Sequence, residues 1–212
     1  VDTGLLYGVV VAFVVGAVII GGIQSIGRVT ATVVPFMCGI YLLTAFAVII
    51  VRIEDVPAAV ATIISEAVAP SAVVGGAIGA MIQGFRRAVF SNEAGSGSAA
   101  IAHSAVKTSE PATQGLVAML EPFIDTVVVC TATGIVIVIS GMYTDQSLTG
   151  ISLTSAAFAS VFGWAPYMVM VAAVLFAVSS MISWSYYGVK AFTYIAGQSQ
   201  ANEMIFKLGF CA

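Results

Sequence analysis

Long apolar stretches separate the few charged positions of this chain. Residues 5–23 and 33–51 contain no charged side chain, and none lies between Asp145 and Lys190. A helix needs about 20 mostly apolar residues to cross a hydrocarbon core of about 30 Å. The pattern therefore predicts an all-α integral membrane protein with about five transmembrane helices. The expected spans are residues 5–23, 33–51, 73–107, 115–141 and 165–189.

Basic residues in the short connections between the expected spans indicate how the chain is oriented in the membrane. Arg28, Lys107 and Lys190 are the basic residues of alternate connections, which the positive-inside rule places on the cytoplasmic side. The connections near Arg52 and Asp145 then face outward. Shorter helices on that outer side are expected near residues 58–69 and 151–162.

The third span, residues 73–107, is longer than a crossing requires. Its middle, residues 91–98, is rich in Ser, Gly and Asn, which break helices. We expect a discontinuous helix, because breaks at membrane depth expose backbone groups that bind ions and small substrates. The alternative is an ordinary cytoplasmic loop over residues 86–98, with Arg86 and Arg87 as its positive charges.

Composition narrows the class of protein further. Charged residues make up 8% of the 212 residues and apolar types 60%, with a formal net charge of −3. So few charges cannot cover a soluble exterior or neutralise nucleic-acid phosphates, and such hydrophobicity excludes a disordered chain. The lipid bilayer is the expected partner, and nucleic acid is not. Because the chain starts without Met and ends on an apolar stretch, 206–212, we expect it to be a fragment with a single transmembrane domain over residues 1–212.

Several ordered motifs along the chain resemble those of one protein family. The most specific motif is residues 87–99, Arg-Ala-Val-Phe-Ser-Asn-Glu-Ala-Gly-Ser-Gly-Ser-Ala, followed by Ala102 and His103. Residues 123–126 (Phe-Ile-Asp-Thr) with 129–133, and 176–180 (Phe-Ala-Val-Ser-Ser) leading to 184–188, are similar to the same family. Residues 21–26 and 34–37 also fit. Together these motifs resemble those of the alanine or glycine:cation symporters, a family of transporters.

The resemblance implies a secondary transporter rather than an enzyme. It implies the 5+5 inverted-repeat fold of sodium-coupled leucine transporters, with this chain as its central part, the fourth to eighth of ten core helices. A small neutral amino acid, alanine or glycine, would enter the cell with Na⁺, or with H⁺ as the alternative coupling ion, and without an organic cofactor. The implied location is the plasma membrane or a bacterial inner membrane, and the implied partners are the remaining helices of a full-length transporter.

The resemblance also implies site residues. Substrate would contact Phe90, Ser91, Asn92, Glu93, Ala94 and Gly95 in the break, and Trp184 would line the pocket. Sodium would be held by the carbonyl of Ala177 and the hydroxyls of Ser179 and Ser180, which are the hard oxygen ligands that such a cation prefers. Ser180 stands where the family more often has Thr. Without the resemblance, serines inside a membrane helix more often bond to their own helix, and Trp184 is more often a packing residue.

Ionisable residues at membrane depth are costly and therefore informative. Glu93 either binds a cation or neutralises Arg86 or Arg87. Glu121 and Asp125 are four residues apart, so they lie on one helix face, where they could share a proton. Glu121 is atypical for the family pattern, whereas Asp125 belongs to it.

Two other classes of membrane protein serve as alternatives. An intramembrane serine hydrolase needs a nucleophile within reach of a His on another helix, yet His103 lies seven residues from Ser96 on the same segment. His103 is more simply a polar residue near the cytoplasmic end. An ion channel would need rings of like charge or a carbonyl filter, which the sequence does not show.

Overall fold

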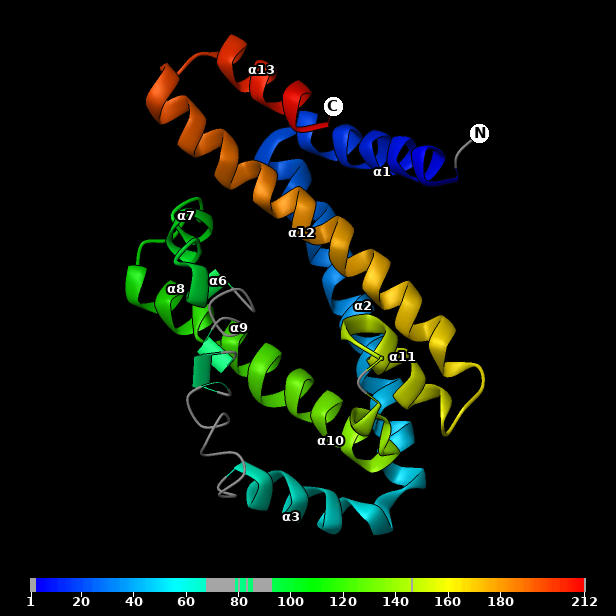
Figure 1. The fold of residues 1–212 in the computed structure, drawn as a ribbon. Coiled ribbons are helices and arrows are strands. Elements are labelled where there is room, and N and C mark those ends of the chain that lie inside the picture. The colour runs from blue at the N-terminus through cyan, green and yellow to red at the C-terminus, as the bar shows by residue number, and fades with distance from the viewer. Residues whose placement is uncertain are drawn as a thin grey trace. The chain divides into compact units, whose positions relative to one another are not determined.

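Every regular element that the structure describes is a helix (Figure 1). This computed structural model describes residues 3–67, 79, 81–82, 84–85, 93–145 and 147–211. The chain divides into two compact units, one of residues 1–39 with 171–212 and the other of residues 40–170. Within the described residues, three helical stretches are long and apolar enough to cross a membrane: Gly22–Val51, Pro111–Ser140 and Ala165–Ala196. The helical membrane class expected from the sequence is confirmed.

The first unit begins with two helices joined by a tight glycine turn. Helix α1, Thr3–Ile20, ends one residue before Gly21, and α2, Gly22–Val51, begins directly after it. Gly22 has φ +70°, a left-handed conformation that glycine adopts without steric cost. We placed Arg28 in a connection between two spans, but it lies inside α2. Residues 24–32 contain no glycine pair or proline that would end a helix, so the chain turns earlier, at the glycines.

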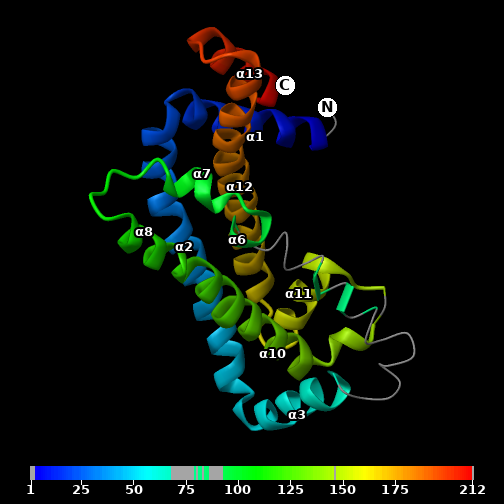
Figure 2. The ribbon, with the colours of Figure 1, turned by 90° about the vertical axis from the view of Figure 1, so that its left-hand side faces the viewer.

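The first unit is completed by the end of α12, Ala165–Ala196, and by α13, Gln200–Cys211, which lies beside α1 in both ribbon views (Figures 1 and 2). α12 starts at the residue expected for the last span and continues seven residues beyond its expected end at 189. Lys190 is accommodated in this extension because its ammonium group lies 5.4 Å from the centre of the Tyr186 ring. The core of this unit is small and aliphatic, consisting of Val15, Ile19, Ile26 and Ile182.

A return turn holds α13 against α12. Gly197 has φ +97°, and the side-chain amide of Asn202 donates to the carbonyls of Ala196 and Gly197, at 2.9 Å each. These bonds occupy carbonyls at the end of α12 that have no partner within the helix. Further along α13, Phe206 reaches the backbone of Gly188 on α12.

The second unit has a buried core built from the end of α2, the start of α12 and two helices between them. The end of α2 is followed by a short 3₁₀-helix, Ile53–Asp55, and by α3, Val56–Ala67. Helix α10, Thr131–Ser140, packs against α3 and also against α11, Gly150–Ala159. Helices are therefore present at both places where the sequence predicted short outer ones. Thr149 and Ser152 form a capping box at the start of α11. The core residues are Ala45, Val48, Ala132, Val136, Ala157, Phe158, Ala165 and Val169.

A chain of short helices occupies the rest of the second unit (Figures 1 and 2). These are α6, Glu93–Ser96; α7, Ala99–His103; α8, Pro111–Ala118; and α9, Leu120–Pro122. A π-helix, Phe123–Cys130, joins α9 to α10, so residues 111–140 are helical almost throughout. This helical stretch corresponds to the span expected at residues 115–141 and starts four residues earlier. It is terminated by Gly141, whose φ is +72°.

Candidate functional site

The predicted helix break contains more local order than the sequence indicated. We expected residues 91–98 to be unwound, but Glu93–Ser96 form one helical turn, closed by a bond of 3.0 Å from the Gly97 N–H to the Glu93 carbonyl. The chain then leaves helical geometry at Gly97, φ +81°, before α7 begins. The helix is thus interrupted at Gly97–Ser98. Phe90, Ser91 and Asn92, together with Arg86 and Arg87, lie outside the described residues.

Polar contacts close this short turn from within. The hydroxyl of Ser98, which is buried, donates to the Oε2 atom of Glu93 and lies 2.7 Å from the hydroxyl of Ser96. The carboxylate of Glu93 is therefore engaged by its own segment. Ala94 and Gly95, the other described residues of the predicted substrate contact, are exposed on the turn.

A second carboxylate reaches the same turn from α9. The Oε1 atom of Glu121 accepts a hydrogen bond of 2.8 Å from the backbone N–H of Glu93. Both residues are half-buried. The sequence placed Glu121 only in relation to Asp125, and it gave no signal of this contact, because 28 residues separate the two partners.

The predicted serine and histidine of a hydrolase have separate partners. The ring Nδ1 atom of His103 lies 2.6 Å from the Nε2 atom of Gln114, which joins α7 to α8. The hydroxyl of Ser96 instead contacts Ser98 and the carbonyl of Glu93. This arrangement holds two short helices together and forms no serine–histidine dyad.

The predicted sodium ligands lie on different faces of α12. Ser179 is buried; its hydroxyl donates to the carbonyl of Phe176 at 2.9 Å and lies 4.0 Å from the sulfur of Met37 on α2. Ala177 is exposed and Ser180 half-buried, three residues apart on another face. The exposed face thus carries the Ser180 hydroxyl, while the Ser179 hydroxyl bonds to its own helix and the Ala177 carbonyl lies inside the continuous helix α12, where carbonyls accept from the N–H four residues on.

Trp184 continues that exposed face. It lies four residues beyond Ser180, half of its surface is exposed, and its ring meets the edge of Tyr187 at a centroid distance of 6.0 Å. Ala177, Ser180 and Trp184 therefore share one face of α12, on which the Ser180 hydroxyl lies one turn from the Trp184 ring.

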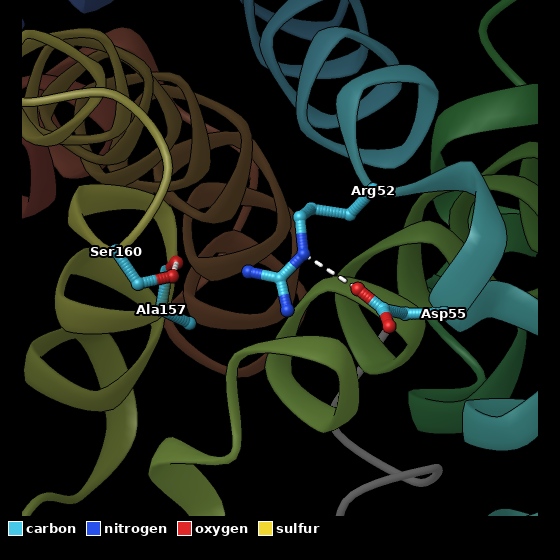
Figure 3. A network of polar contacts seen from close by, with 4 residues as sticks. All are labelled: Arg52, Asp55, Ala157 and Ser160. Atoms are coloured by element: carbon cyan, nitrogen blue, oxygen red, sulfur yellow. Dashed lines mark hydrogen bonds and ion pairs between the residues drawn. The ribbon is translucent and has the colours of Figure 1, made fainter.

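An ion pair lies at the end of α2 (Figure 3). The Nε atom of Arg52 lies 2.5 Å from Oδ2 of Asp55, and both side chains are partly exposed. The guanidinium group extends toward the last turn of α11, where Ser160 donates to the carbonyl of Ala157 at 2.7 Å. A cation near the C-terminal end of a helix is favourable because it opposes the helix dipole. The sequence showed these charges in one connection but not their proximity to α11.

The π-helix is a feature that the sequence analysis missed. It begins directly after Pro122 and contains Asp125, which is half-buried. Proline lacks the N–H that would continue the α-helical pattern, and π-helical turns inside helices are frequent at functional sites. Pro122 was the available signal, but proline alone does not distinguish a kink from a π-helix.

The comparisons with known proteins agree on one family. The profile of the sodium:alanine symporter family matches residues 2–212. The chain is 45% identical over 197 residues to the sodium/alanine symporter AgcS of Methanococcus maripaludis, covering 91% of this chain and 44% of AgcS. It is 39% identical over 186 residues to the amino-acid carrier protein AlsT of Bacillus subtilis, covering 87% of this chain and 40% of AlsT.

A further relative is the sodium/proton-dependent alanine carrier protein of a Bacillus species. It is 31% identical over 220 aligned positions, covering 96% of this chain and 49% of the relative. The chain therefore spans less than half the length of each of these relatives.

Proposed function

The chain belongs to the sodium:alanine symporter family, and from this premise we propose that it forms the central part of a Na⁺-coupled symporter for a small neutral amino acid. The observation that carries the proposal is the family match over residues 2–212, which includes all of the motifs that resemble the family. Proteins of this family are transporters, so the chain is not an enzyme. Its apolar helices fit a membrane protein.

We propose alanine or glycine as the substrate. Two of the three relatives described above carry alanine in their names, one with sodium and one with sodium and protons. A small substrate also suits a site built from Ala94 and Gly95. Na⁺ is the proposed coupling ion and H⁺ the alternative, and the proposed location is the plasma membrane or a bacterial inner membrane.

The proposed architecture is the 5+5 inverted repeat. The chain would supply the fourth to eighth core helices, and the remaining helices of the full-length transporter would complete the site. The interruption at Gly97–Ser98 supports this proposal, because broken helices in such transporters present backbone groups to substrate and ion.

The proposed site has two parts. Phe90, Ser91, Asn92, Glu93, Ala94 and Gly95, with Trp184, would contact the amino acid. The Ala177 carbonyl and the hydroxyls of Ser179 and Ser180 would hold Na⁺. The half-buried Ser180 supports one of these ligands, whereas Ser179 would have to release its bond to Phe176 and the Ala177 carbonyl would have to leave its bond within α12.

Uptake measurements test the proposed function. The full-length transporter is reconstituted into liposomes, and entry of labelled alanine or glycine is followed with and without an inward Na⁺ gradient. We expect uptake that depends on the gradient, with H⁺ gradients tested in parallel. Uptake that ignores both gradients would refute symport.

Site variants test the assignment of residues. Asn92→Ala and Ser180→Ala are expected to abolish or strongly weaken uptake while leaving membrane insertion intact. Ser160→Ala is the matched control, because Ser160 lies at the end of α11 and bonds only to its own helix among the contacts described. Uptake at the unmutated level in both site variants would show that the site lies elsewhere.

A further inference from the structure

We propose that Glu121 is a positioning residue that anchors the start of α6, and that it acts as a hydrogen-bond acceptor rather than as a charge. The inference rests on the proposed function, since α6 begins at Glu93 within the proposed substrate contact. Glu121 itself lies on α9 and belongs to neither proposed part of the site.

The anchor is a single well-formed contact. Oε1 of Glu121 lies 2.8 Å from the backbone nitrogen of Glu93, the first residue of α6. The first N–H groups of a helix have no partner within it, and at membrane depth water does not replace that partner. The side-chain oxygen of Glu121 supplies the acceptor that this N–H needs.

No other described group of α6 performs this task. The carboxylate of Glu93 could fold back on its own helix start, but it accepts from Ser98 at the other end of the turn. Ser96 is also directed there, toward Ser98. The two ends of α6 are therefore fixed by different residues, the later end from within the segment and the first end by Glu121.

The support for the anchor is a continuous helical rod. α9 follows α8 through Met119, whose N–H donates to the Gly115 carbonyl at 3.2 Å, and leads directly into the π-helix. Because Glu121 lies on this helical stretch, its side chain fixes the start of α6 relative to the candidate span Pro111–Ser140. Loss of the contact would release the backbone at Glu93 and the residues after it, Ala94 and Gly95.

A pair of substitutions separates hydrogen bonding from charge. Glu121→Gln keeps a carbonyl oxygen that can accept the same N–H and removes the charge, whereas Glu121→Ala removes the acceptor. In the full-length transporter we expect Glu121→Ala to raise the KM for the amino acid by about tenfold or more, the scale of a buried N–H left without an acceptor, and Glu121→Gln to stay within about threefold of the unmutated KM. Glu54→Ala is the matched control, because Glu54 is exposed.

Amide exchange measures the anchor independently of transport. Hydrogen–deuterium exchange of the segment that contains residues 93–98 is expected to accelerate in Glu121→Ala and to stay near the unmutated rate in Glu121→Gln and Glu54→Ala. If the unmutated transporter takes up no amino acid, the proposed function fails, while the exchange result still decides the anchor.

Three results would overturn the proposal. The first is unchanged KM and exchange in Glu121→Ala. The second is a Gln variant as defective in uptake as the Ala variant, which would show that the charge is required. The third is a defect in maximal rate alone with normal exchange, which would place Glu121 in a later step of the transport cycle.

Discussion

Replacing Gly188 with alanine is expected to disrupt the packing of α13 on α12. A Cβ atom at Gly188 would lie 2.3 Å from Cζ of Phe206 and 2.9 Å from its Cε1, whereas ordinary contacts begin at 3.4 Å. The ring would have to retreat by about 1 Å. Its ring centroid lies 5.6 Å from that of Phe192 and 6.0 Å from that of Phe210, so this retreat also disturbs two aromatic pairs.

Two opposing free-energy terms determine the size of the effect. Overpacking of this kind costs about 1–3 kcal/mol. Alanine in place of glycine inside a helix returns about 1 kcal/mol through helix propensity. We therefore expect Gly188→Ala to lower the free energy of unfolding by up to about 2 kcal/mol. In a Phe206→Ala background the overpacking is absent, so the same change should raise the free energy of unfolding by up to about 1 kcal/mol.

The assay is a double-mutant cycle on the purified protein in detergent micelles, with unfolding followed by circular dichroism. Gly27→Ala is the matched control, because Gly27 lies in α2 with open space around the position of an added Cβ. It should raise stability slightly in both backgrounds. An equal effect of Gly188→Ala with and without Phe206 would refute the argument, because the cost would then not come from this ring.

Three further predictions concern single polar contacts. Tyr41→Phe removes a hydrogen bond of 2.6 Å to the Thr133 hydroxyl. It should lower the free energy of unfolding by about 0.6 kcal/mol, the average measured for hydrogen bonds between membrane helices. In a Thr133→Val background the same substitution should have no such effect. Arg52→Ala removes a partly exposed ion pair and should cost less than about 1 kcal/mol, with a smaller cost at high salt; a larger loss that salt does not change would contradict the surface assignment. Hydrogen bonds from Ser147, first from its hydroxyl and then from its backbone N–H, hold the pKa of Asp145 below its usual range. The ionised carboxylate therefore stabilises the fold at pH values above its unfolded-state pKa, and this contribution is lost as the pH falls through the folded-state pKa. Ser147→Ala should raise the pKa of Asp145 in an NMR titration, and an unchanged titration would show that the backbone bond suffices.

The apolar pattern predicted the long helices because burial in lipid requires an uninterrupted apolar length. It placed the start of α12 at residue 165, and it indicated α3 and α11 as short separate helices. It failed where local backbone geometry decides the outcome. The turn at Gly22 depends on a positive φ, and the position of Arg28 suggested a loop where the helix continues.

The candidate site was predictable only in part, because sequence spacing does not report contacts between distant segments. The spacing of Ala177 and Ser180 correctly implies a shared helix face, and the spacing to Ser179 implies a different one. The contact between Glu93 and Glu121 joins two segments that approach only in the fold. Their sequence neighbours gave no reason to pair two acidic residues.

The π-helix Phe123–Cys130 changes the helical phase of everything that follows it. Each residue added to a helix turn rotates the later side chains by about 100° relative to an uninterrupted α-helix. Helical periodicity carried forward from α8 would therefore assign the wrong face to Ala132 and Val136, which the structure places in the buried core. A deletion of a single residue within 123–130 that restores α-helical winding would turn this core face of α10 away from the end of α2 and from α11.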